Sequence, residues 1–335
     1  MRKIIILILT VFSCTLAYTQ VVHGIVLDQN THKPVSFAAV YFNGSFVGTY
    51  SDNNGYFSLD ISNNRSMPMV ISALGYYSVT IPDLVPDNYY RVYLKPKIFE
   101  LNEVIVSVKG TARQRRERRS NIRFFRDEFI GTTLNSQKCD ILNENELVFK
   151  YSANGDTIRA FSMQPLIIEN RALGYKISYD LEKFEMSRLK GYFCFYGNIM
   201  FLEDLAPGDK RPQVYEKRRK TAFMGSRMQF IRELWNNNLD SAGFTVSDSD
   251  HKKYSYDDLV YLKDSLNKYM RRSGLLNIAY YSMVPRTIFT VSKDSVAFTR
   301  NGNFDGTGIE WAGEMSVPRI ADQLPYEYSP GKKIQ

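Results

Sequence analysis

The stretch GTYSDNNGYFSLDI, Gly48–Ile61, places Asp, Asn and Gly residues between two runs that are rich in aromatic side chains. A calcium loop of the EF-hand kind needs oxygen ligands at its first and last positions and glycine at the sixth. With Gly55 at the sixth position, the first and last positions are Tyr50 and Ile61, which are not side-chain ligands for calcium. The stretch is therefore predicted to be a tight turn, in which Asp52 and Asn53 hydrogen-bond back to the chain and Gly55 adopts a positive φ.

Short strand-like runs surround this turn from Val21 to about Ser107. They are rich in Val, Ile, Tyr and Phe, and Gly, Asn, Asp or Pro residues divide them: VVHGIVLD, PVSFAAVYFNG, SFVGTYSD, GYFSLDI, MVISALGYYSVTI and YRVYLKP. Such regular spacing is typical of a small β-sandwich or barrel. The aromatic content of 14% also favours β structure, since Tyr and Phe suit pleated, half-buried surfaces.

This segment resembles the carboxypeptidase-regulatory-like domain, a transthyretin-like β-sandwich. The resemblance covers about 85 residues, and the positions that fit its pattern are Gly24, Val26, Asp28, Pro34, Ala38, Val40, Gly48, Thr49, Asp52, Gly55, Phe57, Ser72, Gly75 and Tyr76. ELNEVIVS, Glu100–Ser107, is similar to the segment that joins this domain to the plug of TonB-dependent receptors. The resemblance implies an accessory module and no catalytic activity.

Residues 1–19 are predicted to be a signal peptide. A positive start, MRK, precedes an aliphatic run from Ile4 to Phe12 that is too short to anchor the chain across a bilayer. Small and polar residues follow, and Ala17-Tyr18-Thr19 before Gln20 suits ordinary cleavage. The protein is therefore expected in the periplasm or outer membrane, or at the cell surface.

The cysteines leave two alternatives open. VFSC, which ends at Cys14, resembles a lipoprotein box, and lipidation there would tether the protein to a membrane. Ordinary cleavage leaves Cys139 and Cys194, which can form a disulfide in an oxidising compartment. The other reading is two unrelated buried thiols, because Cys packs well as a small hydrophobe.

Positive charge gathers in two clusters, RQRRERR at Arg113–Arg119 and KRRK at Lys217–Lys220. The formal net charge is +8, and removal of Arg2 and Lys3 leaves +6. These clusters are either solvated faces or contacts for anionic lipid or glycan phosphate, so Arg113–Arg119 is a candidate for membrane association. An exported protein is not expected to bind nucleic acid.

The chain is accordingly divided into four parts. They are the signal peptide 1–19, the β-sandwich 20–107, a basic linker 108–128 that can form a charged helix, and an α+β domain 129–330. The last part contains FIGTTLNSQKCDILNENELVF, PLIIENRALGYKISYDLEKFE and RIADQLPYEYSP. These runs resemble the region that follows the module in many exported proteins of Gram-negative envelopes. No established activity comes with this resemblance.

Within residues 129–330 the pattern alternates between strands and helices. Hairpins are predicted around Asn154-Gly155-Asp156 and around Lys293-Asp294. One long helix is predicted in residues 214–238, where Phe223, Phe230, Ile231, Leu234 and Trp235 recur at helical spacing. A second amphipathic helix is predicted over residues 255–272, with Ser255 as its N-cap.

Zinc carboxypeptidase chemistry is not expected. Its catalytic zinc site needs an H-x-x-E pair and a distant histidine. The three histidines, His23, His32 and His251, begin the runs HGIV, HKPV and HKKY. No catalytic residue, metal site or cofactor is predicted.

A candidate glycan contact lies in NFDGTGIEWAGEM, Asn303–Met315, which combines Asp305, Glu310 and Trp311 with three glycines. Trp311 could be a stacking platform in a sugar-binding groove. The alternative is a Gly-rich turn with Trp311 in the core.

The sequence favours an exported, non-catalytic binding or scaffolding protein of the cell envelope, in which the sandwich contacts a partner protein or glycan. One rival is an envelope hydrolase with a carboxylate-based site in the second domain, where Glu203-Asp204 and Asp257-Asp258 are adjacent acids. The other is an accessory lipoprotein of a TonB-dependent receptor system.

Overall fold

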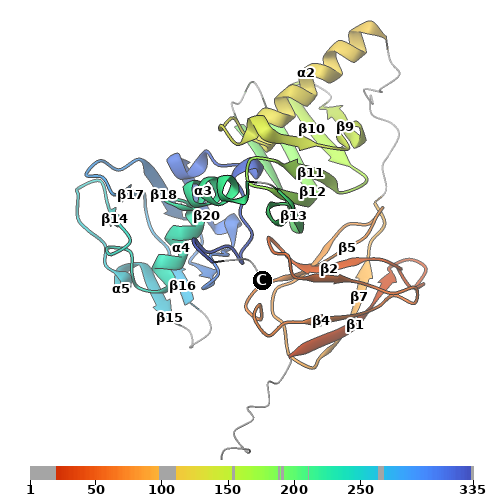
Figure 1. Ribbon diagram of the computed structural model, residues 1–335, viewed down its shortest axis with the longest axis horizontal. Helices are drawn as coiled ribbons and strands as arrows, with labels where there is room; N and C mark the ends of the chain where they lie inside the picture. The colour runs from red at the N-terminus through yellow and green to blue at the C-terminus, as the bar shows by residue number, and fades with distance from the viewer. Residues whose placement is uncertain are drawn as a thin grey trace, which may run out of the picture.

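The computed structural model describes residues 20–97, 111–152, 155–187, 189, 192–209, 211–262 and 268–332. The predicted signal peptide, the lipidation candidate Cys14 and the segment Glu100–Ser107 lie outside the described residues. The fold is mostly β, with an N-terminal sandwich and a larger C-terminal part that contains the helices (Figure 1). The predicted fold class is confirmed. No helix in the described residues is both long and apolar enough to cross a membrane.

Two sheets form the N-terminal sandwich, with strand orders β4-β1-β7 and β3-β2-β5-β6. β1 is antiparallel to β4 and parallel to β7, and the second sheet is antiparallel throughout. The strands are β1 Val21–Asp28, β2 Ala39–Phe42, β3 Gly48–Tyr50, β4 Tyr56–Asp60, β5 Met69–Ser72, β6 Val79–Ile81 and β7 Tyr89–Leu94. In β4, Phe57 and Leu59 are buried while their neighbours face water, because successive strand residues point to opposite faces.

The turn between β3 and β4 has the predicted form at Asp52 and Gly55, whereas Asn53 takes part through its backbone carbonyl, which accepts from the Ser36 hydroxyl at 2.9 Å. The Asp52 carboxylate accepts hydrogen bonds from the backbone N–H groups of Asn54 and Tyr56, both at 2.8 Å. Gly55 has a φ of +78°, and a Cβ there would lie 2.7 Å from the carbonyl oxygen of Val26. Asp52 is therefore occupied in holding the turn, and the site is structural.

A six-stranded sheet forms the centre of the C-terminal part. Its strands are β8 Cys139–Ile141, β9 Leu147–Tyr151, β10 Thr157–Ser162, β11 Leu166–Asn170, β12 Tyr175–Ser187 and β13 Tyr192–Asp204. The long strand β12 pairs with β11 near its start and with β10 near its end, and β13 pairs with it along its length. The predicted hairpin around Gly155 is confirmed, since β9 and β10 pair antiparallel.

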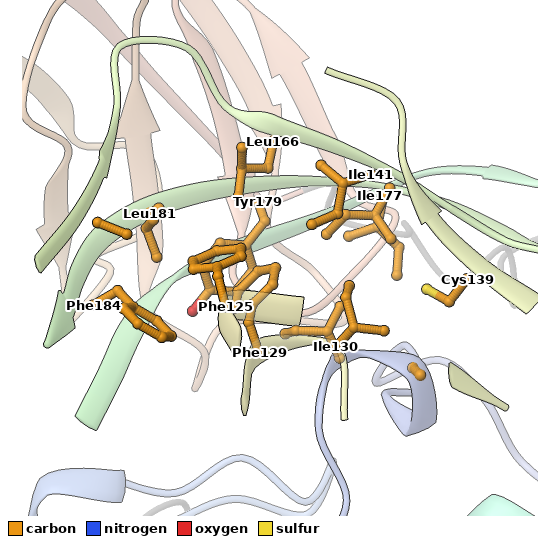
Figure 2. Packing of buried hydrophobic residues seen from close by; sticks show 14 of the residues in the cluster. Phe125, Phe129, Ile130, Cys139, Ile141, Leu166, Ile177, Tyr179, Leu181 and Phe184 are labelled. Atoms are coloured by element: carbon orange, nitrogen blue, oxygen red, sulfur yellow. The ribbon is translucent and has the colours of Figure 1, made fainter. Parts of the chain in front are cut away.

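Helix α2, Ala112–Phe129, corrects the prediction of a basic linker over residues 108–128. Thr111 caps the helix in a capping box with Gln114. Phe125 and Phe129 are fully buried, and Figure 2 shows them among side chains of the six-stranded sheet. The described part of this segment is thus part of the C-terminal core, and most of its arginines lie on the exposed face of the helix.

The long helix predicted in residues 214–238 is two helices, α3 Pro212–Phe223 and α4 Arg227–Trp235. Gly225 has a φ of +74°, which ends the first helix, and the Ser226 hydroxyl caps the second by accepting from the N–H of Gln229 at 3.2 Å. Four of the five stripe residues, Phe223, Phe230, Ile231 and Leu234, are buried as the periodicity predicted.

Replacing Gly225 with alanine is expected to lower the free energy of unfolding by more than about 1 kcal/mol. The residue has a positive φ, and the added Cβ would lie 2.9 Å from the Tyr280 ring. Urea unfolding followed by circular dichroism measures the change. Gly208→Ala is the control, because its Cβ would meet no atom within 4 Å. Equal stability of the two variants would contradict a strained break at Gly225.

Two further sheets complete the C-terminal part, with orders β14-β17-β18-β20 and β15-β16-β19. The elements are β14 Phe244–Ser247, α5 Tyr256–Leu259, β15 Val260–Leu262, β16 Lys268–Arg271, β17 Leu276–Tyr280, β18 Thr287–Val291, β19 Ser295–Phe298 and β20 Ile309–Gly313. Helix α4 packs into the core that they form.

Two predictions fail in these sheets. The helix predicted over residues 255–272 ends at Leu259, and β15 and β16 then pair antiparallel. The capping box at Ser255 and Asp258 is present, but pairing of β16 with β19 prevails over local helix propensity. The hairpin predicted around Lys293-Asp294 is also wrong, since β18 and β19 belong to different sheets.

The contacts between the sandwich and the six-stranded sheet include a buried ion pair and backbone hydrogen bonds. Lys97 forms an ion pair with Asp180 of β12 at 3.1 Å, and both side chains are buried. The turn after β2 meets the outer edge of β13, where Gly44 N–H donates to the Ile199 carbonyl at 2.7 Å and Phe201 N–H donates to the Ser45 carbonyl at 2.9 Å. The two units therefore share backbone hydrogen bonds as well as a buried charge pair.

Candidate functional site

The three histidines lie apart, on β1 and in two loops. His32 and His251 both have positive φ values, 57° and 63°, and both are exposed. Within the described ranges, no group of three or more His, Cys, Asp or Glu side chains has the geometry to hold a metal ion.

Of the two alternatives left open for Cys139 and Cys194, the structure does not show the disulfide. Both cysteines are free. Cys139 lies opposite Asn170, beside the start of β12, whereas Cys194 lies opposite Glu185, ten residues further along that strand. Ten strand residues span about 33 Å, far beyond the reach of a disulfide. Burial raises the pKa of the Cys139 thiol to about 12, so this residue packs as a small hydrophobe.

The structure does not bring Asp305, Glu310 and Trp311 together as one site. Asp305 accepts from the Lys293 ammonium at 2.7 Å and from the Thr307 N–H at 2.9 Å. Burial alone would raise the pKa of the Asp305 carboxyl, but these hydrogen bonds outweigh burial and lower the pKa below its usual value. Glu310 is exposed, and it points away from Trp311 because adjacent strand residues face opposite sides.

Trp311 lies at the margin of the core. Its ring stacks on Phe289 at 5.5 Å between centroids and meets Phe230 edge-on at 6.0 Å. Its indole Nε1 is buried and has no hydrogen-bond partner among the described residues. The rest of the ring lines a pocket, so Trp311 combines the core role with a place at a candidate binding surface.

This pocket, called here the aromatic pocket, has a volume of about 580 Å³. It lies between the first half of β13, the residue Trp311 of β20, the start of α4 and the segment 316–323. Its lining consists of Tyr179, Phe193, Cys194, Phe195, Tyr196, Gly197, Ile199, Arg227, Trp311, Ser316, Pro318, Arg319, Ile320 and Gln323. None of these residues is a carboxylate or a histidine, while two are arginines.

The rings of the aromatic pocket are held by packing behind them. Phe193 and Phe195 are stacked with centroids 6.4 Å apart, and Phe195 contacts Phe129 of α2 at 5.3 Å. The guanidinium of Arg319 lies over the ring of Phe193 at 5.0 Å. This arrangement suits binding of a flat or ring-shaped ligand by stacking and by donated hydrogen bonds.

A second pocket of about 680 Å³ lies between the loop after α2, the α3–α4 break and the end of β17. It contains two carboxylates, Glu314 and Asp322. Glu314 pairs with Arg286 at 2.9 Å, and Asp322 accepts from Thr133 at 2.9 Å. Both carboxylates are therefore already bonded within the protein.

One acid of each adjacent pair noted in the sequence, Asp204 and Asp258, has a structural partner. The Asp204 carboxylate forms an ion pair with the guanidinium of Arg219 at 2.6 Å, and this guanidinium also lies 4.0 Å from the ring centroid of Tyr175. Asp258 caps α5, and its hydrogen bonds from Ser255 lower its pKa. Neither acid lines one of the two pockets described above.

Comparison with curated proteins finds no match. A solved structure from Bacteroides uniformis is described as a "putative carbohydrate binding protein". Its alignment covers 83% of the present chain and 98% of the Bacteroides chain. The identity is 12% and the TM-score 0.19, which is too low to support any inference. The family model of the CarboxypepD_reg-like domain matches residues 22–106, so the N-terminal β-sandwich has the domain type that its sequence pattern indicated.

Proposed function

We propose that this protein is an exported, non-catalytic binding protein of the cell envelope, and that the aromatic pocket binds a glycan. The observation that carries the proposal is the pocket lining, which combines aromatic rings with two arginines and contains no carboxylate or imidazole. The CarboxypepD_reg-like sandwich fits a binding role. In this proposal the sandwich is the module that contacts a protein or glycan partner in the envelope.

The pocket has the properties of a small-ligand site. Its volume of about 580 Å³ lies within the range that such sites occupy, and its lining combines aromatic and aliphatic side chains with polar groups, among them Arg227, Arg319 and Gln323. Sugar rings present C–H faces that can pack on aromatic rings, while their hydroxyls accept hydrogen bonds from arginine. Phe193 and Trp311 supply such rings from two different strands.

Replacing Phe193 with alanine is expected to weaken glycan binding by about 1 kcal/mol, roughly fivefold in Kd, because a stacking ring is lost. The ring is 36% exposed, so the change should leave the fold intact. A glycan array identifies the ligand, and isothermal titration calorimetry measures the affinity.

Tyr50→Ala is the matched control for this experiment. Tyr50 is an exposed aromatic residue as well, with 55% of its surface accessible, but it lies on β3 and outside the aromatic pocket. Equal binding by the two variants would place the glycan elsewhere. Turnover of envelope glycans or peptides would instead favour the hydrolase.

Export is tested on the protein isolated from cells. A mature chain that begins at Gln20 or Val21, found by mass spectrometry in the periplasm or outer membrane, supports ordinary cleavage. A diacylated Cys14 would favour the alternative, a lipoprotein that accompanies a TonB-dependent receptor.

A further inference from the structure

Arg227 differs from the other arginines in the core of the C-terminal part. Arg118, Arg219, Arg232 and Arg319 all donate hydrogen bonds to backbone carbonyls. Arg227 is the first residue of α4 and is half-buried, yet it makes no side-chain hydrogen bond or ion pair within the part of the chain that the structure describes. Its side chain lines the aromatic pocket and the adjoining pocket beneath Tyr326.

An unpaired, half-buried guanidinium in this position lowers the stability of the folded protein. It carries five N–H donors, and half-burial removes part of their hydration without replacing it. Burial first, and then repulsion from Arg319, lowers the pKa of Arg227, while the phenol of Tyr326 acts in the opposite direction. No carboxylate contributes to this balance.

Arg319 places a second guanidinium on the same pocket. Its Nε donates to the carbonyl of Glu128 at 3.2 Å, and its Nη1 donates to the carbonyls of Ser316, Val317 and Pro318. Its Nη2 has no hydrogen bond to any described residue. These bonds hold the Arg319 guanidinium in place and leave Nη2 available to donate to a ligand. The negative charge of Glu128 raises the pKa of Arg319 and does not contribute to that of Arg227.

We propose that Arg227, assisted by Arg319, binds an anionic group of the ligand, so that the glycan of the aromatic pocket is an acidic saccharide. This inference rests on the proposed glycan-binding function. The planar guanidinium fork matches a carboxylate or a sulfate through two parallel hydrogen bonds. The helix dipole at the start of α4 favours a negative charge at the same point. Phe193 then stacks on the sugar ring that carries the group.

The test compares three tetrasaccharides of equal length: one that contains glucuronic acid and N-acetylglucosamine, one of the sulfated heparin type, and neutral chitotetraose. We expect at least one acidic probe to bind about tenfold or more tightly than chitotetraose, as a charge-assisted bidentate contact allows. The two acidic probes distinguish carboxylate from sulfate recognition. In Arg227→Met the preference is expected to disappear, and in Arg227→Lys part of it should remain.

Arg113→Met is the charge-matched control, because Arg113 is exposed on α2 and outside the pocket. It should keep the acidic preference. Thermal unfolding without ligand gives a second readout. Arg227→Met should be at least as stable as the unsubstituted protein, since the methionine removes a charge that has no partner. A structural arginine would instead lose stability when substituted.

Each remaining outcome decides against the inference. If chitotetraose binds as tightly as the acidic probes, or if Arg227→Met keeps the preference, glycan binding stands and the anionic recognition is overturned. If Arg227→Met unfolds at a lower temperature, Arg227 has a structural role. If none of the three tetrasaccharides binds, but the glycan array yields another, neutral ligand, only the acidic class is wrong. If no glycan binds at all, the proposed function and the inference both fail.

Discussion

Replacing Lys97 with methionine is expected to lower the free energy of unfolding by about 3–5 kcal/mol. Lys97 and Asp180 form an ion pair at 3.1 Å, and their side chains are only 7% and 5% exposed. Methionine has similar length and no charge, so the Asp180 carboxylate would remain buried and, among the described residues, would keep only the Ser72 hydroxyl, at 3.0 Å, as a hydrogen-bond donor. Urea denaturation of the whole chain, followed by circular dichroism, measures the loss.

A surface pair provides the control for this prediction. Arg272 and Asp294 lie 3.3 Å apart, but their side chains are 69% and 96% exposed. Arg272→Met should change stability by less than about 1 kcal/mol. A second variant, Lys97→Met with Asp180→Leu, should recover much of the loss, because no charge remains buried. A loss at Lys97 as small as the loss at Arg272 would show that water reaches Asp180.

Replacing Phe129 with alanine is expected to cost about 3–5 kcal/mol of stability. Phe129 is fully buried, with ring centroids 4.8 Å from those of Phe125 and Tyr179. The cavity would also remove the support behind Phe195, one wall of the aromatic pocket. We therefore expect weaker glycan binding together with lower stability, measured by calorimetry and by thermal unfolding.

Arg116→Ala is the matched change on the opposite face of α2. Arg116 is exposed, and alanine is a good helix former, so the expected effect lies within about 0.5 kcal/mol. A Phe129 variant as stable as the Arg116 variant would mean that α2 is a charged linker helix and not part of the core.

The sandwich could be predicted from the sequence because its signals are local. Asp52 and Gly55 form a turn through bonds within five residues, and the alternation of Phe57 and Leu59 with polar neighbours assigns one face to the core. Such features depend on the chain around them and little on distant parts. The hairpin of β9 and β10 was predictable for the same reason.

Other elements depend on contacts that sequence spacing does not reveal. Residues 260–262 and 268–271 suit a helix locally. In the structure β16 instead pairs with β19, and Met270 lies opposite Val296. In the linker prediction, the charges of α2 concealed the importance of Asn121, Phe125 and Phe129, which form a buried stripe at helical spacing. Counting that stripe would have indicated a helix packed on a core.

The candidate site was predicted only at Trp311. The aromatic pocket joins Phe193, Arg227, Trp311 and Arg319, whose sequence separations give no sign of proximity. One signal was present in GYFCFYGN, where aromatic residues occupy both faces of a strand. None of the residues 192–197 is fully buried in the structure, so a run interpreted only as apolar proves to be a surface.

The contact between the turn after β2 and β13 gives the sandwich a protective role. The outward N–H and C=O groups of an edge strand can pair with another chain and so promote aggregation. Asn43, Gly44 and Ser45 bond these groups at Ile199 and Phe201. Without the sandwich, the backbone groups of Ile199 and Phe201 would be free to pair with a second molecule. The N-terminal module therefore also limits self-association through this edge of β13.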